Sequence, residues 1–407
     1  MTGFPLRPLW TVADEVRLVV EPATIDGDVV HYNIPALEAT GEPTVEPAAN
    51  IKSGKLLLSG DEVLISRLNP RKSRVARARP AALPLLASTE FVPLRPVDCD
   101  PRFLTYCLLS ESTRQHLDSQ VRSVTRSHQR VEPLHITHLQ IPTPNRDQQE
   151  RIANFLDDQL SRLDRLTSAR VRQLSLLDER LIARLEQRVL DLAAEFDVAP
   201  LGRYFRRIEQ GWSPQCEDRV PSEQEWGVLK VSAVKAGTFR ADESKALPTD
   251  LSAQAAYEVR PGDLLISRAN SPRLVGEMAV VPNGSRQRLL LCDKLFRLRL
   301  KDDLDASYVA LIGRTRQVRD HFALSATGTS QSMVNIRTDD LRALALPVPP
   351  LALQETFVED AEADAMQNDL LRSLLSRQMA LTEERRQSLI TAAVSGQFDV
   401  TTARAVA

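Results

Sequence analysis

Arginine-rich loops follow two similar predicted strands, and their side chains are of the types that bind nucleic acid. The first basic run contains no acidic residue and holds Arg67, Asn69, Arg71, Lys72, Arg74, Arg77 and Arg79. The corresponding loop of the second half holds Arg268, Asn270, Ser271 and Arg273. Arg, Asn and Ser side chains bind phosphate oxygens and base edges. A charged run is usually a solvated face, but its recurrence in two equivalent loops indicates contact with DNA.

A second polar set precedes a proline-rich segment in each half. These sets are Ser127, His128, Gln129 and Arg130 in the first half, and Thr329, Ser330 and Gln331 in the second. Lys294 lies in a further basic stretch, and Gly211-Trp212-Ser213-Pro214 forms an aromatic loop. We include Lys294, Trp212 and Ser213 among the candidate DNA contacts, although a core tryptophan beside a turn explains Trp212 equally well.

No motif for catalysis accompanies these loops, so we expect neither an active site nor a metal site in this chain. The sequence contains no G-x-x-x-x-G-K-[ST] loop and no G-x-G-x-x-G loop. It also lacks the Asn- or Asp-Pro-Pro-aromatic stretch of amino-methyltransferases. Glu243-Ser244-Lys245 has the Glu-x-Lys pattern that nucleases can use, but a single tripeptide of this kind is expected by chance in a charged chain. His135 and His138 lack accompanying cysteines or carboxylates, which favours a structural role.

Two runs without glycine or proline, 146–198 and 353–395, predict the elements that position the loops. Apolar residues recur every three or four positions, as on one face of a helix. They include Ile152, Phe155, Leu156, Leu160, Leu163 and Leu166 in the first run, and Phe357, Leu370, Leu371 and Leu374 in the second. Helices of this length need a partner, so we expect the two runs to form an antiparallel coiled coil.

The order of predicted elements before each long run is the same, which indicates an internal repeat. The first half has expected strands at 15–20, 28–32 and 62–67 and an expected helix at 103–117. The second has expected strands at 226–231, 263–268, 277–281 and 289–291 and an expected helix at 307–322. Leu64-Ile65-Ser66-Arg67-Leu68-Asn69 closely matches Leu265-Ile266-Ser267-Arg268-Ala269-Asn270.

The predicted fold class is α+β, with two similar globular α/β domains separated by the antiparallel coiled coil and related by a pseudo-twofold repeat. The expected boundaries are a first recognition domain at 1–144, a helix at 145–199, a second recognition domain at 200–349, a helix at 350–397 and a tail at 398–407. Two such heads on a stiff spacer would contact two half-sites of one duplex.

Composition limits the other classes of protein. The 407 residues suffice for two cores. Charged residues make up 26% of the chain and the net charge is −2, so any basic surface must be local. The four cysteines form no C-x-x-C pair, which is typical of reduced thiols. The N-terminus lacks a secretory core and no apolar run could cross a bilayer, so we expect a soluble cytoplasmic protein without a membrane partner.

Three segments outside the basic loops carry a family resemblance. They are Ile141-Pro142-Thr143-Pro144 with the following Gln148 to Leu156, Leu346 to Pro350 with Gln354-Glu355, and the C-terminal block Leu389 to Gln397. Together with the two hexapeptides, they resemble the DNA-specificity subunits of type I restriction–modification systems over nearly the whole chain. Thr356-Phe357 departs from the family pattern, which has a basic and an apolar residue after Gln-Glu.

The resemblance implies a non-catalytic subunit that reads a split sequence of double-stranded DNA, one half per domain. It implies that two methyltransferase subunits bind the helices and that a motor-nuclease subunit joins for cleavage. The candidate partner contacts are Gln149, Arg151, Phe155, Gln354 and Phe357. S-adenosylmethionine, ATP and Mg are then expected on the partners, with no cofactor on this chain. A two-headed DNA-binding regulator and a coiled-coil scaffold, both without enzymatic partners, are the alternatives.

Overall fold

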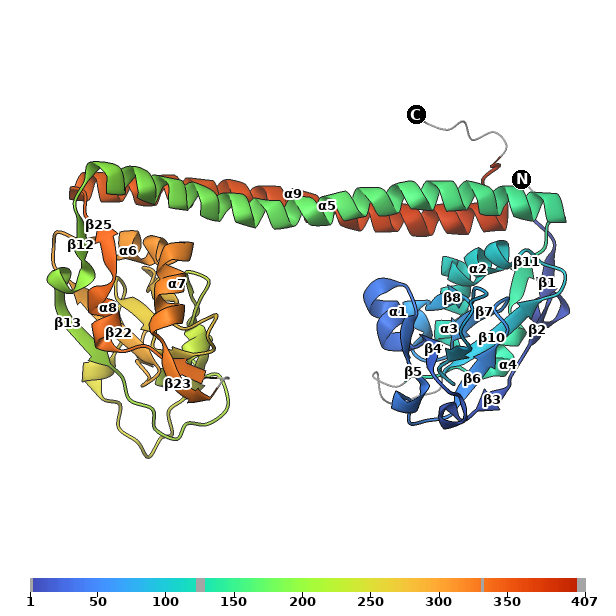
Figure 1. The fold of residues 1–407 in the computed structure, drawn as a ribbon, viewed down its shortest axis with the longest axis horizontal. Helices are drawn as coiled ribbons and strands as arrows, with labels where there is room; N and C mark the ends of the chain where they lie inside the picture. Colours follow the sequence, from blue (N-terminus) through green and yellow to red (C-terminus); the bar gives the residue numbers. More distant parts are fainter. Residues whose placement is uncertain (1–2, 122–128, 331–332, 401–407) are drawn as a thin grey trace. The chain divides into compact units, whose positions relative to one another are not determined.

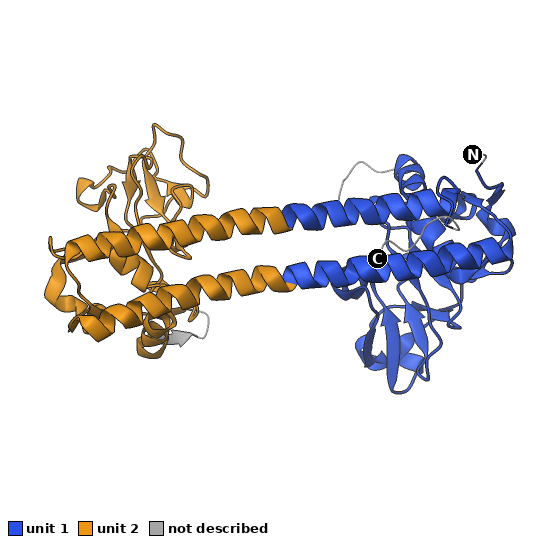
Figure 2. Ribbon diagram, turned by 90° about the horizontal axis from the view of Figure 1, so that it is seen from above, with its two compact units in different colours: residues 1–171, 376–407 blue, residues 172–375 orange. Residues whose placement is uncertain are grey.

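The computed structural model describes residues 3–121, 129–330 and 333–400, which fall into two compact units. Unit 1 comprises residues 1–171 and 376–407, and unit 2 comprises residues 172–375 (Figure 2). Each unit contains a globular part and one section of each long helix. We call the globular parts head 1, residues 3–145, and head 2, residues 196–350.

Head 1 is built on two antiparallel or mixed sheets, ordered β2-β10-β7-β8 and β3-β6-β9-β4-β5 (Figure 1). Its strands are β1 Leu6–Pro8, β2 Ala13–Glu15, β3 Val19–Val20, β4 Asp28–Tyr32, β5 Thr44–Pro47, β6 Lys55–Leu58, β7 Val63–Ser66, β8 Val75–Arg77, β9 Leu85–Ala87, β10 Phe91–Pro96 and β11 Gln140–Pro142. Its helices are α1 Ile34–Thr40, α2 Pro101–Leu109, α3 Glu111–Ser119 and α4 Pro133–Thr137.

Head 2 contains the sheets β13-β22-β18-β20, β17-β14-β21 and β19-β24-β23. Its strands are β12 Val198–Pro200, β13 Phe205–Gln210, β14 Gly227–Leu229, β15 Val234–Lys235, β16 Thr238–Phe239, β17 Ser244–Ala246, β18 Leu264–Ser267, β19 Ala269–Asn270, β20 Met278–Val280, β21 Leu289–Leu290, β22 Leu295–Leu300, β23 Thr327–Ser330, β24 Met333–Asn335 and β25 Ala345–Pro347. Its helices are α6 Ala306–Ile312, α7 Arg316–Ser325 and α8 Thr338–Ala343.

The strand register repeats between the heads. In head 1, Ser66 of β7 pairs with Phe91 of β10. In head 2, Ser267 of β18 pairs with Leu295 of β22. The hexapeptides that match in sequence therefore occupy matching strands, and each strand is a buried central member of a four-stranded sheet.

Two expectations about local structure were wrong. The single helices expected at 103–117 and 307–322 are each broken into two, at Ser110 and before Arg316. Ser110 adopts an extended backbone and its hydroxyl accepts a hydrogen bond from Thr113 N, which starts a new helix. The strand expected at 15–20 is also split, because β2 pairs with β10 while β3 pairs with β6 of the other sheet.

The proline-rich segments form short antiparallel ladders just before the long helices. β11 pairs with β1, with Leu6 opposite Pro142. β25 pairs with β12, with Val198 opposite Pro347. Each ladder ties the segment that leads into a long helix to a strand from the start of the same head.

The long helices are α5, Arg146–Glu195, and α9, Leu351–Ser395, and their sections run antiparallel within each unit (Figure 2). In unit 1 they share one apolar core, to which α5 contributes Leu156 and Leu160 and α9 contributes Ile390 and Val394. In unit 2 the shared core includes Leu185, Val189, Phe357 and Ala361. No helix in the described part of the chain has the length and apolarity that spanning a membrane requires.

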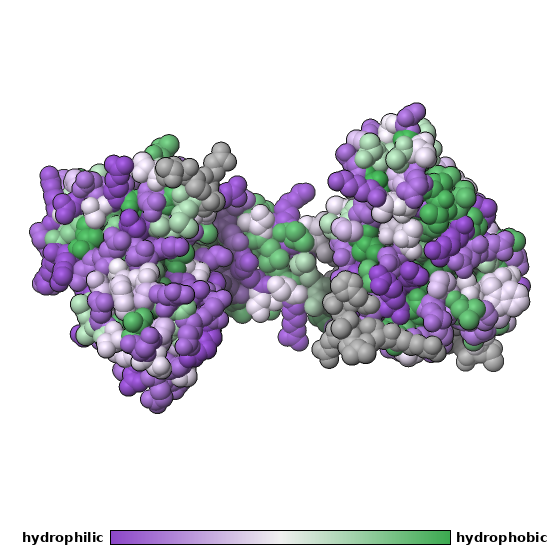
Figure 3. All heavy atoms as spheres, turned by 90° about the horizontal axis from the view of Figure 1, so that it is seen from below, coloured by the Kyte–Doolittle hydropathy of each residue, from purple (hydrophilic) through white to green (hydrophobic). Residues whose placement is uncertain are grey.

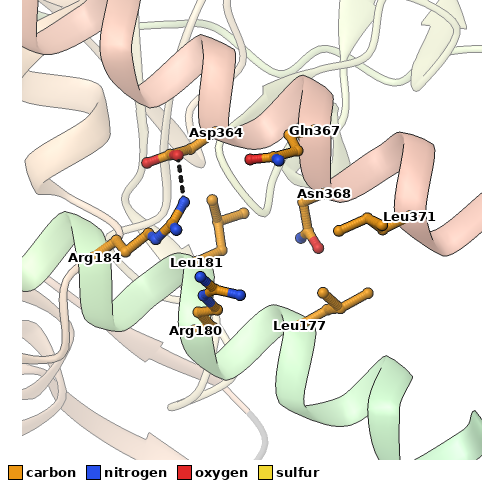
Figure 4. Close-up of a pocket in the computed structure, with 8 residues that line it drawn as sticks. All are labelled: Leu177, Arg180, Leu181, Arg184, Asp364, Gln367, Asn368 and Leu371. Carbon is orange, nitrogen blue, oxygen red and sulfur yellow. Dashed lines mark hydrogen bonds and ion pairs between the residues drawn. The ribbon is translucent and has the colours of Figure 1, made fainter.

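The helix pair of unit 2 also contains a polar position (Figure 4). Leu177 and Leu181 of α5 and Leu371 of α9 line a small cavity of about 70 Å³ beside Asn368. Arg184 Nη1 lies 2.7 Å from Asp364 Oδ1 at its edge. The Asn368 side chain is buried, and its oxygen has no hydrogen-bond partner among the described residues. The seam is therefore not uniformly apolar.

Candidate nucleic-acid interface

The loop after β7 is fastened to the segment before α4 by backbone hydrogen bonds. The Arg67 carbonyl accepts from Val131 N at 3.0 Å, and Leu68 bridges to Arg130. Asn69 N donates to the Gln129 carbonyl at 2.7 Å. The two basic sets predicted in the first half therefore meet. Ser127 and His128, which belong to the second of these sets, lie outside the described residues.

The turn within this loop is set by two left-handed residues. Asn69 has φ 48° and Ser73 has φ 42°, and they flank a 3-10 turn at Pro70–Lys72. Asparagine tolerates this conformation better than most residues, and proline presets the next φ. Arg71 and Lys72 lie at the exposed tip of the turn. This placement suits contact with a ligand that approaches from outside.

Glu90 gathers two of the candidate arginines in head 1. Its carboxylate accepts from Arg67 Nε at 3.3 Å and from Arg130 Nη2 at 2.8 Å. The hydrogen bond from Arg130 is the main cause of a lowered pKa of Glu90, which therefore stays ionised. Sequence reasoning missed Glu90, because an acid far along the chain gives no local signal of its partners.

Glu38 of α1 plays the same part for Lys72 and Arg74. Hydrogen bonds from Lys72 and then Arg74 lower the pKa of Glu38. Arg74 also donates from Nη1 to the Leu68 carbonyl at 2.7 Å, and only 8% of its side chain is exposed. Arg74 therefore braces the loop from inside with donors that are engaged within the head, and its contact with DNA stays a prediction.

The equivalent loop of head 2 uses the same backbone bonds. The Arg268 carbonyl accepts from Ile336 N at 3.0 Å, as Arg67 does from Val131. β19 pairs with β24, with Asn270 opposite Val334, and β24 pairs with β23. Thr329 and Ser330 belong to β23, which lies in the same sheet as Asn270 but on the far side of β24, whereas Gln331 lies outside the described residues.

The side chains of this loop have local partners. The Arg268 guanidinium lies 5.8 Å from the centre of the Phe296 ring and donates to the Asp293 carbonyl at 3.3 Å. Asn270 Nδ2 donates to Ser267 Oγ at 3.2 Å. The Ser271 carbonyl accepts from Leu274 N at 2.9 Å and so closes the turn that exposes Arg273.

The aromatic loop of head 2 joins the same region. The Ser213 hydroxyl bonds to the Asp293 carboxylate and accepts from Asp293 N at 3.1 Å. Trp212 N donates to the Leu291 carbonyl at 2.9 Å, and the Trp212 side chain is half-buried against the apolar core. Lys294, the next residue after Asp293, is exposed. Trp212 therefore packs on the core while Ser213 and Lys294 remain at the rim.

Both clusters present donors of the kinds that contact phosphates and base edges on loops held by backbone bonds. A loop fixed in this way presents its side chains with little loss of conformational freedom on binding. Within the described residues, no group of three or more His, Cys, Asp or Glu side chains is arranged to hold a metal ion. The chemistry that this arrangement supports is recognition.

The residues predicted to contact protein partners are mostly engaged inside the chain. Gln149 is 4% exposed; its Oε1 accepts from Asp100 N at 2.8 Å and its Nε2 donates to Pro144 O at 2.9 Å. Gln354 is 0% exposed and makes the matching bonds with Asp305 N and Pro349 O, both at 2.8 Å. Both amides therefore fix a long helix to its own head, and contact of either residue with a partner protein stays a prediction.

The aromatic candidates are also occupied. Phe357 is buried and packs edge-on against Tyr308, with ring centres 5.0 Å apart. The Phe155 ring lies 5.6 Å from that of Phe398 and is half-buried. The structure therefore does not present Phe357 to a partner. Arg151 alone among the five candidates is exposed.

Exposed apolar residues on the helices were not foreseen. Met366 is 75% exposed and Leu370 is 60% exposed, although the sequence pattern placed Leu370 on a buried face. Other exposed apolar side chains are Leu176, Leu371 and Leu374 in unit 2, and Leu166, Val171 and Leu381 in unit 1. A two-helix seam buries one stripe of each helix and leaves further apolar positions open. Figure 3 shows such hydrophobic residues on the visible face of the helices.

Comparison with known proteins gives sequence matches but no match to a family model. The chain is 31% identical over 192 residues to the type I restriction enzyme EcoEI specificity subunit of Escherichia coli, covering 47% of this chain and 32% of that protein. It is 24% identical over 282 residues to the EcoKI specificity subunit of Escherichia coli strain K12, covering 66% and 60%. The chain thus spans about a third of the length of the first relative and 60% of the second.

Solved structures share the fold. A chain from a study of complex assembly and conformational transition of the type I R-M system has a TM-score of 0.71 at 18% identity, with 97% of this chain and 98% of that chain covered. The HsdS subunit of Thermoanaerobacter tengcongensis has a TM-score of 0.54 at 18% identity, with 97% of each chain covered. The predicted fold class and the predicted resemblance to type I specificity subunits are confirmed.

Proposed function

We propose that this chain is the non-catalytic DNA-specificity subunit of a type I restriction–modification complex. Each head binds one half of a split target in double-stranded DNA. Two methyltransferase subunits bind the long helices, and a motor-nuclease subunit joins them for cleavage. S-adenosylmethionine, ATP and Mg belong to those partners, and the complex works in the cytoplasm.

The observation that carries the proposal is the repeated attachment of an arginine-bearing loop. Arg67 accepts from Val131 N and Arg268 accepts from Ile336 N, both at 3.0 Å, so two heads hold equivalent loops in equivalent frames. The side chains around the frames differ, with Glu90 and Arg130 in one and Lys294 and Ser213 in the other. The same backbone arrangement with different side chains suits two domains that recognise two different half-sites.

The exposed apolar side chains on the helices support the partner part of the proposal. Met366, Leu370 and Leu374 recur at four-residue spacing on α9 within unit 2. Exposed apolar side chains that gather on one surface mark interaction sites in soluble proteins. The matched relatives are named as subunits of restriction enzymes, which fits a chain that works in an assembly.

The proposal is tested with Arg67→Ala and Arg268→Ala in the full chain, co-produced with its methyltransferase partner. Each change should relax sequence preference in a different half of the target, by about 1–3 kcal/mol for a lost base contact. The measurement is a map of methylated adenines in the host, with and without the gene, together with DNA affinity.

Arg206→Ala is the matched control, because Arg206 is an exposed arginine of head 2 that pairs with Asp302 away from the loop. This variant should keep the wild-type methylation map. Wild-type maps and affinities in both test variants would contradict the assignment of the loops. A host map that does not change with the gene would contradict the function itself.

A further inference from the structure

Unit 1 contains a cavity of about 240 Å³ between head 1 and α5. Its walls come from the end of β4, the turn after α1, the edge strand β8, α2 and α5. The lining residues with polar side chains are Tyr32, Glu42, Arg77, Arg79, Arg102, Thr105, Tyr106 and Asp157. None of the lining residues belongs to the loop at 67–74, so this cavity is separate from the loop that we propose to contact DNA bases.

Two arginines face this cavity from one strand. Arg77 ends β8 and Arg79 follows it, and residues two apart on an extended strand point to the same side. Ala78 between them points the other way and is buried in the core of head 1. Within the described residues, neither guanidinium forms an ion pair or a side-chain hydrogen bond. The cavity therefore has two uncommitted cations on one wall.

The acidic group that α5 contributes to the lining is already engaged. Asp157 of α5 accepts from Arg102 Nη1 at 3.0 Å and from the Tyr106 hydroxyl at 2.5 Å. Burial and this hydrogen bond raise the pKa of Tyr106, which therefore keeps its proton. Glu42, an exposed residue after α1, is the other carboxylate in the lining. The positive charge of Arg77 and Arg79 is thus opposed within the cavity by Glu42.

We propose that this cavity binds a phosphate group between Arg77 and Arg79, and that the phosphate belongs to the backbone of DNA held by head 1. Paired guanidinium groups suit phosphate oxygens because each offers a planar fork of donors. β8 follows the loop at 67–74 directly and ends at Arg77. Its three residues span about 10 Å at 3.3 Å each, which sets the distance from the loop to Arg77. A duplex seated on the loop would carry its backbone along β8. This inference rests on the DNA-binding function proposed above.

The test is the double variant Arg77→Gln/Arg79→Gln in the full chain. A lost phosphate contact lowers the slope of log affinity against log salt by about 0.9, so the slope should fall by roughly 1 when this single phosphate contact is lost. Sequence preference should stay unchanged, because phosphate contacts carry no base information. Binding to target and non-target duplexes is measured by fluorescence anisotropy across a salt series.

The matched control is Arg17→Gln/Lys52→Gln. Both residues are exposed in unit 1 and neither lines the cavity, so this variant removes the same charge elsewhere. Its slope should match that of the wild type. Glu42→Gln should act in the opposite direction and raise affinity for both duplexes, since it removes the carboxylate that opposes a phosphate.

An unchanged slope in the Arg77/Arg79 variant, with Arg67→Ala still weakening binding, would overturn the cavity proposal and leave the function standing. Inorganic phosphate separates the two sources of the group. If phosphate raises the thermal midpoint of the wild type but not of the double variant, while the DNA slope is unchanged, the site takes a free anion and the DNA assignment is wrong. If neither effect is seen, the phosphate site itself is overturned.

Discussion

Head 1 and head 2 hold their key arginines in the same backbone frame but surround them with opposite charges. Arg67 N donates to the Glu90 carbonyl and Arg268 N donates to the Lys294 carbonyl, both at 2.9 Å. The frame therefore places an acid in head 1 where head 2 has a lysine. Glu90 holds Arg67 by an ion pair, whereas Arg268 lies over the Phe296 ring and the Lys294 side chain is exposed.

The difference shows how a duplicated fold can diverge in binding without changing its backbone. In head 1, Arg67 and Arg130 would have to exchange Glu90 for a base or phosphate when DNA binds. In head 2, Lys294 forms no ion pair with a described residue, so it needs no such exchange there and adds to the attraction for phosphates. We therefore expect head 2 to supply more of the salt-dependent affinity for DNA. The affinity of head 1 should depend more on which DNA bases it contacts.

The largest effect on stability should come from the buried glutamine that attaches each head to its long helix, a feature that the two heads share. Gln354→Ala would leave Asp305 N, Pro349 O and Asp303 O without their buried partner, and Gln149→Ala would do the same to Asp100 N and Pro144 O. Loss of buried hydrogen bonds of this kind costs about 1–3 kcal/mol each before relaxation. Urea unfolding of the full chain should show both variants destabilised, Gln354→Ala by more.

The control for this pair is Gln367→Ala, since Gln367 lies exposed on α9 and should change stability little. A loss in both variants, with Gln354→Ala losing more, would support a shared mode of attachment. A loss from one variant and none from the other would break the comparison, because the two heads would then be attached to their helices in different ways.

The elements of the fold that depend on local sequence pattern could be predicted from the sequence. The uninterrupted runs gave α5 and α9, and the matched hexapeptides gave β7 and β18 with the loops that follow them. Spacing of apolar residues and the absence of proline are properties of neighbouring positions, so they can be read without a structure. The pairing of the two helices followed from their length, because neither could bury its apolar face alone.

The partners of individual charges could not be predicted in this way. Arg74 was grouped with the DNA contacts because it stands in a basic run, yet its partners are Glu38 and the Leu68 carbonyl. Gln149 carries a family motif, but one of its two bonds is to Asp100 N at the start of α2, which lies 49 residues away along the chain. Tertiary contacts of this kind leave no periodic trace, so sequence reasoning assigned these side chains to the surface.

The charge difference itself is tested by Lys294→Glu, which gives head 2 the acid that head 1 has. The change removes an exposed cation and adds an anion near Arg268, so DNA affinity at low salt should fall by about tenfold, or roughly 1.4 kcal/mol. The reverse change, Glu90→Lys, should raise affinity for non-target DNA. Equal salt slopes for Lys294→Glu and the wild type would remove the proposed division between the heads.

The smallest effect concerns the cost of releasing Glu90. Hydrogen bonds from Arg130 hold the pKa of Glu90 below its ordinary value, so the ion pair contributes stability above about pH 4.5 that is lost as the pH falls through the lowered pKa. Arg130 is half exposed and screened, so Glu90→Gln should cost only about 0.5–1 kcal/mol at pH 7. Urea unfolding at pH 7, 5 and 3.5 should show this difference shrink in acid.

Asp98→Asn provides the comparison for that last measurement, because Asp98 pairs with Arg7 at 3.4 Å on a largely exposed surface and should show almost no loss at any pH. A Glu90→Gln loss that stays constant down to pH 3.5 would mean that packing, and not charge, holds this side chain in place. The arginines of head 1 would then be free to reach DNA without breaking an ion pair, and the two heads would differ less than their charges suggest.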